Sequence, residues 1–190
     1  MIPLSNYFPV SEFSPEQIEK LEIYRSELVR WNRRVNLVSR REKEIDYHFI
    51  DSAYFAKSIV DISGTWVDVG SGGGFPGLCA AILLPEHKFT LFEVIDRKFA
   101  FLNHIKNITG TTLQIRNERM EKSMDTSWDN AVCRALMAKN EWLDLMSDNA
   151  ENLWFLASED QLDEKQNWEI VSNWNLKNHG RRFLIKHNRT

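Results

Sequence analysis

The sequence predicts an α/β fold built on a mostly parallel sheet, with helices on both faces and an antiparallel hairpin at the C-terminal end. Three observations support this fold class. Short apolar segments alternate with longer amphipathic ones between Thr65 and residue 157, as in chains whose strands and helices alternate. The glycine-rich stretch VDVGSGGGFPG (67–77) directly follows the first apolar segment. Two further apolar runs flank the turn signal NHG (178–180), which indicates a hairpin at one edge of the sheet.

Two helices are expected before the first strand. The stretch SPEQ (14–17) combines a serine cap, a proline in the first turn and a glutamine three residues after the cap, which is a typical helix start. Apolar residues then recur at helical spacing, so we expect a helix over 15–35 and a second over 44–60. We expect residues 1–62 to form an N-terminal helical cap and residues 63–190 the main domain, together one compact unit.

From Thr65 onward, strands and helices are expected to alternate. In such a sheet, ligands bind beyond the carboxyl ends of the strands, near the point where the strand order reverses. The segment after the first strand is therefore where we expect the functional site. The expected strands are 65–69, 88–94, 111–117, 129–135 and 153–157, the expected helices begin at Pro76 and cover 96–108 and about 139–149, and the final hairpin pairs 169–177 with 181–187.

Length and composition fit one globular domain of 190 residues, of which 43% are hydrophobic and 27% charged. No apolar run approaches the roughly 18 residues that span a bilayer, and the N-terminus carries no secretory pattern, so we expect a cytoplasmic protein that does not enter a membrane. The two cysteines, Cys79 and Cys133, lack metal-ligand spacing, so we expect no metal site. We interpret both as buried small hydrophobic residues, although Cys133 at a strand end also fits a nucleophile.

The formal net charge is −3, but the basic residues are concentrated in two stretches. Seven lie between Arg25 and Lys43, and five more follow from Lys177 onward with no acid among them. Such clusters suit an anionic polymer and equally a solvated helix surface. The expected phosphate contacts are Arg33, Arg34, Arg40 and Arg41, to which Lys177, Arg181 and Arg182 could add.

The glycine-rich stretch places flexible backbone where a ligand would lie. Gly70, Gly72 and Gly74 let the chain pass close to a bound molecule, and Asp68 stands just before them in the strand. Glu93 ends the second strand, 23 residues after Gly70, where a carboxylate can accept hydrogen bonds from both hydroxyls of a ribose. Strand, glycine turn, helix, strand and terminal acid together predict a nucleoside-containing cofactor.

Two classes of cofactor compete at this turn. Gly72 to Gly77 also matches G-x-G-x-x-G, the dinucleotide pattern, so an NAD-dependent dehydrogenase is one interpretation. Against it, Asp68 places a negative charge beside any pyrophosphate, and Pro76 lacks the N–H that a phosphate would need. S-adenosylmethionine has no phosphate and carries a sulfonium and an ammonium group, which suit an acidic neighbour. The residues therefore favour S-adenosylmethionine.

Short motifs occur in a fixed order between residues 18 and 136. They are WNRRVNLVS (31–39), HFIDSA (48–53), VDVGSGGGFPGL (67–78), RKFAFL (97–102), ERME (118–121) and DNAVCRA (129–135). In this order they are similar to the motifs of the RsmG (GidB) family of class I S-adenosylmethionine-dependent methyltransferases. That family methylates guanine N7 in small-subunit (16S) ribosomal RNA.

The resemblance implies a Rossmann-like class I methyltransferase fold, with S-adenosylmethionine as the cofactor of the domain over 63–190. It implies small-subunit ribosomal RNA or the 30S subunit as the partner of a monomeric enzyme. Glu93 would hold the ribose, the backbone at Met120 and Glu121 would contact the adenine edge, and Arg134 would be the catalytic residue. The cofactor-binding residues would be Asp68, Gly70, Gly72, Gly74, Phe75, Glu93, Met120, Glu121 and Arg134.

Several alternatives stay open. After the fifth strand the family has an A-L-K-G-like stretch where this chain has Ser158 and Glu159, so a non-catalytic RNA-binding relative is one alternative. A small-molecule methyltransferase on the same sheet is another. His48 and Asp51 share a helix face and could anchor the helical cap to the sheet or contact RNA. Arg134 could instead be the structural partner of a nearby acid.

Overall fold

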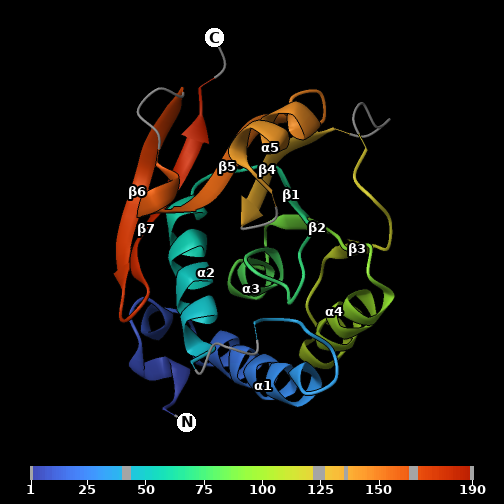
Figure 1. Ribbon diagram of the computed structural model, residues 1–190. Helices are drawn as coiled ribbons and strands as arrows, with labels where there is room; N and C mark the ends of the chain where they lie inside the picture. Colours follow the sequence, from blue (N-terminus) through green and yellow to red (C-terminus); the bar gives the residue numbers. More distant parts are fainter. Residues whose placement is uncertain (1, 40–43, 122–126, 135–136, 163–166, 189–190) are drawn as a thin grey trace.

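The computed structural model describes residues 2–39, 44–121, 127–134, 137–162 and 167–188. Its strands are β1 (Thr65–Val69), β2 (Lys88–Phe92), β3 (Gln114–Arg116), β4 (Trp128–Arg134), β5 (Ala150–Ser158), β6 (Trp168–Leu176) and β7 (Gly180–His187). They form one seven-stranded sheet in the order β3-β2-β1-β4-β5-β7-β6 (Figure 1). The first five strands pair in parallel, and β7 runs antiparallel to both β5 and β6. The predicted fold class is confirmed, including its hairpin edge.

The predicted helices are also present, with shifted ends. The first helix stops earlier than expected because the Asn32 side chain turns the chain back. Its Oδ1 accepts hydrogen bonds from the N–H groups of Leu37 (2.8 Å) and Val38 (3.1 Å). The helices are α1 (Pro15–Asn32), α2 (Asp46–Ile59), α3 (Gly77–Leu83), α4 (Asp96–Thr109) and α5 (Lys139–Met146), with short 3-10 turns η1 (Leu4–Asn6), η2 (Val10–Glu12) and η3 (Glu159–Gln161).

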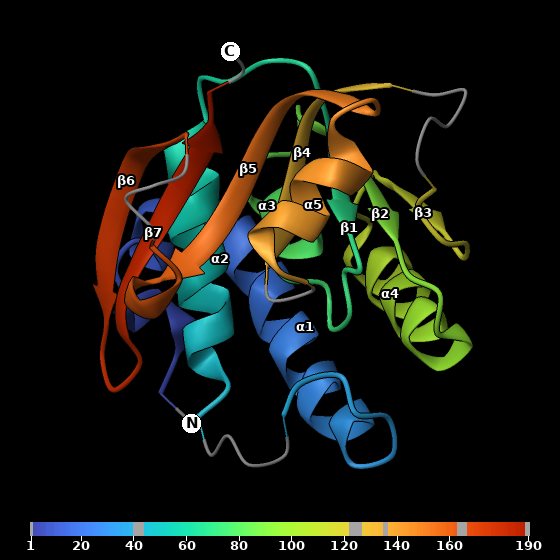
Figure 2. The same ribbon diagram turned by 45° about the horizontal axis from the view of Figure 1, so that its top comes forward.

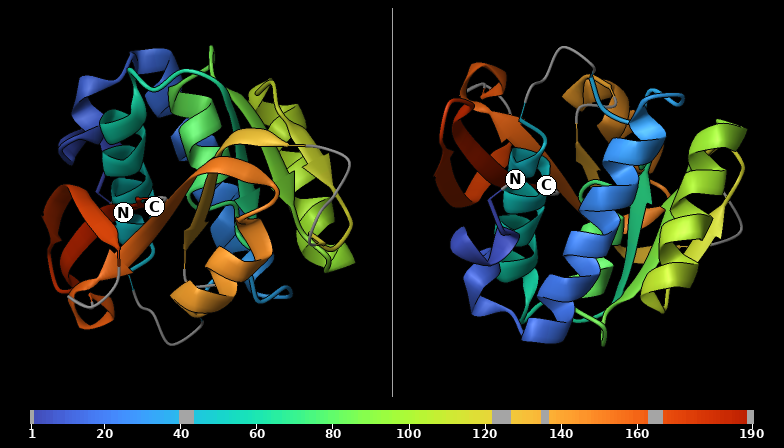
Figure 3. Two further views of the ribbon diagram at one scale, coloured as in Figure 1. Left: turned by 90° about the horizontal axis from the view of Figure 1, so that it is seen from above. Right: turned by 90° about the horizontal axis from the view of Figure 1, so that it is seen from below.

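The two faces of the sheet are covered unequally. On one face α1 to α4 share a core with side chains such as Trp66, whereas α5 covers the other face with Trp142 and Met146 packed in the same cluster as Val67. Consecutive strand residues such as Trp66 and Val67 serve opposite faces because side chains alternate along a strand. Figure 2 shows α5 in front of the sheet and α1 and α2 behind it, and Figure 3, from below, shows α1 between α2 and α4.

The N-terminal segment before α1 is an ordered part of the fold, although the sequence pattern predicts no element there. Leu4 and Val10 are fully buried. The Leu4 N–H donates to Glu22 Oε1 at 2.6 Å, and Arg25 Nη1 donates to the Ile2 carbonyl at 2.8 Å. Turns of three residues are too short to show a periodic pattern, which explains why sequence analysis missed them.

The helical cap and the sheet share one core. Phe55 of α2 packs edge-on against Trp66 of β1 with ring centroids 5.6 Å apart. The division at residue 62 stays a prediction. In the part of the chain that the structure describes, no helix is both long and apolar enough to cross a bilayer.

Candidate functional site

The glycine-rich stretch forms the turn between β1 and α3, where the strand order reverses between β1 and β4. Gly70, Gly72 and Gly74 have φ angles of 70°, 57° and 96°. These angles lie in the left-handed region, which residues with side chains rarely adopt. From α1, the Tyr24 hydroxyl donates a hydrogen bond to the Gly73 carbonyl. The turn therefore requires its glycines and is held in place by the helical cap.

The backbone N–H groups of this turn bond mainly within the protein. Gly70 and Ser71 donate to the Phe92 carbonyl at 2.9 and 3.1 Å. Gly74 and Phe75 donate to the Ser71 carbonyl at 2.7 and 3.3 Å. A phosphate-binding turn instead directs several N–H groups at its ligand. This arrangement disfavours the dinucleotide interpretation and suits a cofactor without phosphate.

Asp68 lies beneath the turn, 1% exposed. Its Oδ2 accepts a hydrogen bond of 3.0 Å from the Gly77 N–H at the start of α3. A Cβ at Gly77 would lie 2.6 Å from that same oxygen, so the contact requires glycine there. A carboxylate is favourable at a helix N-terminus. Asp68 therefore stabilises the turn, and its contact with a cofactor stays a prediction.

Burial raises the pKa of Asp68 to about 6, opposed by hydrogen bonds from Gly77 and Ser71. Between about pH 4 and 6 the folded protein retains a proton that the unfolded chain has released, so the free energy of unfolding falls as pH rises. Asp68→Asn is neutral at every pH and escapes this loss. The difference in unfolding free energy between variant and parent should therefore shift by about 3 kcal/mol in favour of the variant from pH 4 to pH 7. Urea unfolding at both pH values measures this, and a pH-independent difference would contradict it.

Glu93 directly follows β2 and reaches the turn, with 4% of its surface exposed. Its Oε2 accepts from the Gly72 N–H at 2.9 Å, and its Oε1 accepts from the Ile95 N–H at 2.8 Å. The Asn117 side chain donates to its carbonyl at 2.9 Å. A carboxylate has about four acceptor positions, so about two remain for hydroxyl donors. Glu93 is thus fixed in orientation and retains acceptor capacity.

A cavity of about 340 Å³ opens beside the turn and beyond the end of β2. This volume lies within the range of pockets that hold small organic ligands. Of the predicted cofactor-binding residues, Gly70, Met120 and Glu121 line it, whereas the lining does not include Asp68, Gly72, Gly74, Phe75, Glu93 and Arg134. The other lining residues are mainly apolar: Val69, Phe92, Val94, Glu118, Arg119, Met137 and Leu145.

Arg134 ends β4 and connects the sheet to α2. Its Nη1 donates to Asp51 Oδ2 at 3.1 Å, and its Nη2 donates to His48 Nδ1 at 2.7 Å. Its Cζ lies 5.3 Å from the centroid of the Phe75 ring, which also stacks on His48 at 5.0 Å. The structure therefore confirms that His48 and Asp51 anchor the helical cap to the sheet.

Asp51 is fully buried and joins three segments. Its Oδ1 accepts a hydrogen bond of 2.9 Å from the Trp174 Nε1 on β6. The Nε of Arg182 on β7 lies 3.6 Å from the same oxygen. Two guanidinium groups, those of Arg134 and Arg182, therefore share one carboxylate. Sequence analysis missed Trp174 because 123 residues separate it from Asp51 and no local pattern connects them.

His48 is neutral at physiological pH. Its pKa is held well below the ordinary value, first by burial and then by the positive charges of Arg134, His179 and Arg182. Since Arg134 donates to Nδ1, we assign the ring proton to Nε2. A neutral imidazole accepts this hydrogen bond without repelling the guanidinium.

The residues predicted to contact RNA are described only in part. Arg33 and Arg34 follow α1 and are exposed. Arg40 and Arg41 lie outside the described residues. On the hairpin, Arg181 is exposed, whereas Arg182 turns inward to Asp51.

Further expectations concern the two cysteines and the segment after β5. Cys79 and Cys133 are fully buried, and burial raises the pKa of Cys79 to about 12, which confirms the interpretation of both as small hydrophobic residues. The segment after β5, where the sequence differs from the family motif, forms the 3-10 turn η3. The Ser158 N–H donates to Gln161 Oε1 at 3.0 Å, and Glu159 is exposed.

Solved structures share the fold at low sequence identity. The ribosomal protein L11 methylase of Lactobacillus delbrueckii subsp. bulgaricus has a TM-score of 0.57 and 14% identity, over 77% of this chain and 81% of that one. The Pyrococcus abyssi tRNA (uracil-54, C5)-methyltransferase, solved with S-adenosyl-L-homocysteine, has a TM-score of 0.53 and 10% identity, over 72% of this chain and 38% of that one. These similarities establish a Rossmann-like methyltransferase fold.

Sequence comparison identifies the family. The ribosomal RNA small subunit methyltransferase G of Ruegeria pomeroyi is 39% identical over 142 residues, covering 72% of this chain and 68% of that protein. That of Ruegeria sp. (strain TM1040) is 35% identical over 133 residues, covering 66% of this chain but only 63% of the relative. The family model GidB, described as rRNA small subunit methyltransferase G, matches residues 17–180. The chain therefore belongs to the GidB family.

Proposed function

We propose that the chain transfers a methyl group from S-adenosylmethionine to N7 of a guanine in small-subunit ribosomal RNA. One observation carries this proposal: the buried carboxylate of Glu93 meets a glycine turn whose N–H groups bond mainly within the protein, beside a mainly apolar cavity. Family membership supports the reaction and the substrate. A ribosomal substrate also supports the predicted cytoplasmic location.

The residues present fit S-adenosylmethionine. Glu93 would accept the ribose hydroxyls at its remaining acceptor positions. The cavity between Gly70 and Met120 would hold the adenine ring against apolar walls. The Glu121 carbonyl accepts from Asn149 Nδ2 at 2.8 Å and keeps a second lone pair for the adenine amine. No group in this arrangement needs a phosphate.

The proposed reaction needs no general acid or base from the protein. When bound, S-adenosylmethionine supplies an electrophilic methyl group on a sulfonium. Guanine N7 carries a free lone pair, so no general base has to remove a proton first. The main task of the protein is alignment. We assign Arg134 to the target base, because three of its five N–H donors are not used by Asp51 or His48 and guanine O6 stands beside N7.

We expect Glu93→Gln to weaken the binding of S-adenosylhomocysteine by roughly 10- to 150-fold, the loss of a charge-assisted hydrogen bond to ribose. The N–H groups of Gly72 and Ile95 donate to the two carboxylate oxygens of Glu93, whereas a glutamine side chain has only one acceptor oxygen. Isothermal titration calorimetry measures the affinity, and thermal unfolding checks that the variant is folded.

The matched control is Glu118→Gln, which makes the same change of charge at an exposed residue lining the same cavity. We expect it to leave the affinity within about threefold of the parent, as for an exposed, weakly coupled charge. Equal losses in the two variants would contradict the assignment of Glu93 to ribose.

The function itself is tested in cells and with purified protein. Deleting the gene should abolish chemical cleavage of small-subunit RNA at a 7-methylguanosine, and the purified chain with S-adenosylmethionine should restore that cleavage to 30S subunits from the deletion strain. Binding of the cofactor without any RNA methylation would favour the small-molecule methyltransferase. Absence of cofactor binding would favour the non-catalytic relative.

A further inference from the structure

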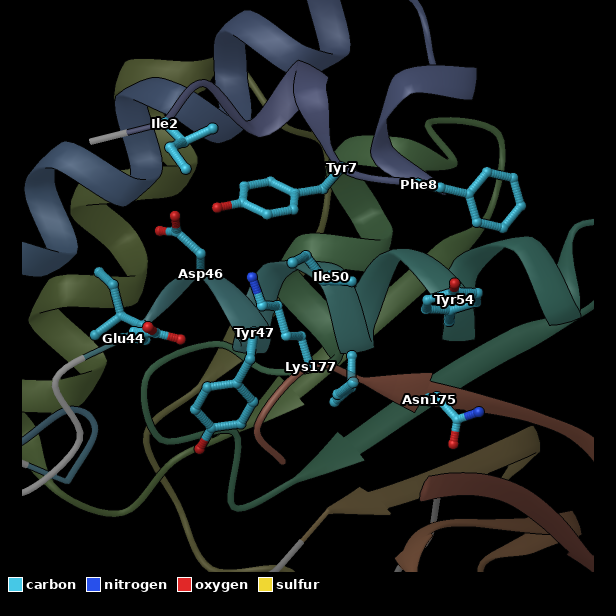
Figure 4. A pocket seen from close by; sticks show the side chains of 12 residues that line it. Ile2, Tyr7, Phe8, Glu44, Asp46, Tyr47, Ile50, Tyr54, Asn175 and Lys177 are labelled. Carbon is cyan, nitrogen blue, oxygen red and sulfur yellow. The ribbon is translucent and has the colours of Figure 1, made fainter. Parts of the chain in front are cut away.

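A second cavity, of about 480 Å³, lies between the N-terminal segment, the start of α2 and the end of β6 (Figure 4). The function proposed above makes no use of it. Its volume suits a small organic ligand. Four of its twelve lining residues are aromatic: Tyr7, Phe8, Tyr47 and Tyr54.

A buried arginine, Arg25, connects the N-terminal wall of this cavity to α1 and α2. Arg25 is 6% exposed and contacts Asp46 at 3.2 Å and Glu22 at 2.5 Å, besides its hydrogen bond to the Ile2 carbonyl. The Tyr7 hydroxyl points toward Asp46 (Figure 4), and the pKa of Tyr7 is raised by burial and then by this carboxylate. The ring of Tyr7 is therefore oriented before any ligand arrives.

Tyr7 is the ring best placed to stack on a ligand. Tyr47 is already stacked on His179, with centroids 3.8 Å apart, and Tyr54 on Trp174 at 5.1 Å. Among the described residues, Tyr7 has no aromatic ring packed against it. Its ring lines the cavity and, among those residues, is not already paired with another ring.

Two large apolar side chains at the rim of the cavity are exposed. Ile2 is 56% exposed and Phe8 is 52% exposed, and both belong to the lining. Exposed apolar side chains gathered at a concavity indicate a binding surface more than isolated ones do.

The cavity adjoins the candidate reaction site through α2. Tyr47 lines the cavity, and the next residue, His48, bonds to Arg134 and stacks on Phe75. The rings of Tyr47 and His48 are themselves 4.0 Å apart. The start of α2 therefore connects this cavity to the arginine that we assign to the target base.

The polar groups of the lining match a nucleotide. Asn175 offers both a donor and an acceptor, and the exposed Glu44 can accept from an exocyclic amine. Lys177 extends across the cavity toward Asp46 (Figure 4) and supplies a cation for phosphate. Aromatic stacking combined with contacts to base edges is how proteins hold unstacked bases of single-stranded RNA.

A cationic peptide side chain is the competing occupant, since rings and carboxylates also attract cations. Two observations disfavour it. The ammonium of Lys177 reaches into the cavity and would repel a cation. Asp46 already pairs with Arg25, which offsets part of its charge.

We propose that this cavity binds an unstacked nucleotide of the substrate RNA, adjacent in the strand to the methylated guanine, with its base on Tyr7 and its phosphate near Lys177. The proposal rests on the proposed function, because that function makes RNA the substrate.

The test is a titration of the full chain followed by amide NMR, with the cofactor site first saturated by S-adenosylhomocysteine. Each of the four nucleoside 5′-monophosphates is added in turn. We expect shifts at Tyr7, Tyr47, Tyr54 and Lys177 with at least one of them. Tyr7→Leu should weaken this binding about tenfold, the loss of one base–aromatic stack, and Tyr7→Phe should retain it.

Thermal unfolding of both Tyr7 variants checks that they are folded. Failure of S-adenosylhomocysteine to bind in the first step would count against the proposed function alone, since the nucleotides are still tested afterwards. The nucleotide site is overturned by equal shifts with inorganic phosphate, by shifts only with N-acetyl-arginine amide, by shifts confined to residues around Met120, or by no shifts with any nucleotide.

Discussion

Asp51→Asn is expected to lower the free energy of unfolding by about 3–5 kcal/mol. The side chain is fully buried, and its carboxylate is shared by the guanidinium groups of Arg134 and Arg182. Asparagine has nearly the same shape but no charge, so both guanidinium groups lose the counter-ion that they share. Removing one partner of a buried ion pair is strongly destabilising because an uncompensated charge stays in the interior. Urea unfolding measures the loss.

Trp174→Phe is the control for this prediction. It removes the neutral indole N–H that donates to Asp51 and part of the ring that stacks on Tyr54, and it leaves both ion pairs intact, so we expect a loss of about 2 kcal/mol. At a temperature where both variants are folded, Asp51→Asn should also slow methyl transfer, because Arg134 loses one of its two α2 partners. The affinity of Asp51→Asn for S-adenosylhomocysteine should stay unchanged, because that affinity depends on Glu93. Equal destabilisation by the two substitutions would contradict the role given to Asp51.

Gly74→Ala is expected to lower the free energy of unfolding by about 2–6 kcal/mol, as backbone strain adds to overpacking. Gly74 has a φ of 96°, which strains any residue with a side chain. Its Cβ would also overlap the Tyr24 hydroxyl and lie 3.0 Å from Leu78 Cβ. Tyr24 is fully buried and packed against the turn, so it has little room to move. Thermal and urea unfolding measure the effect.

Gly72→Ala separates the strain of the turn from its packing. Gly72 also has a positive φ, 57°, but among the described residues a Cβ there would meet just the Gly70 carbonyl, at 3.7 Å. We expect a loss of about 1–2 kcal/mol, the cost of the left-handed conformation alone. Gly72→Ala should nevertheless weaken S-adenosylhomocysteine binding if the backbone approaches the ligand as proposed. Equal losses of unfolding free energy in Gly74→Ala and Gly72→Ala would contradict the close packing of Gly74 against Tyr24 and Leu78.

Most of the fold follows from local patterns in the sequence. The capping box at Ser14 and Gln17 is present in the structure, with both of its hydrogen bonds. The segment TWVDV forms strand β1, and the turn signal NHG lies at the turn between β6 and β7, as predicted. The N-terminal turns could not be predicted from local patterns, because side chains of α1 hold them in place and the turns show no periodicity. Local patterns also do not report how helices divide between the two faces of the sheet.

The candidate site was predictable where one segment determines it. The glycine turn and Glu93 adjoin because parallel strands end at the same edge, and the Gly72 N–H donates a hydrogen bond to the Glu93 carboxylate. The contacts of Arg134 with α2 and of Asp51 with the hairpin depend on tertiary packing between distant segments. The packing of Phe75 shows the same limit: its ring is 5% exposed and packs against Tyr24, His48 and Arg134, and its contact with the cofactor stays a prediction.

A crystal structure of the chain with S-adenosylhomocysteine tests the central claim most directly. The account predicts the adenine in the cavity beside Met120 and both ribose hydroxyls on the carboxylate of Glu93, with the sulfur near the glycine turn. Density for S-adenosylhomocysteine elsewhere on the chain, or for a phosphate-bearing molecule on this turn, would contradict it.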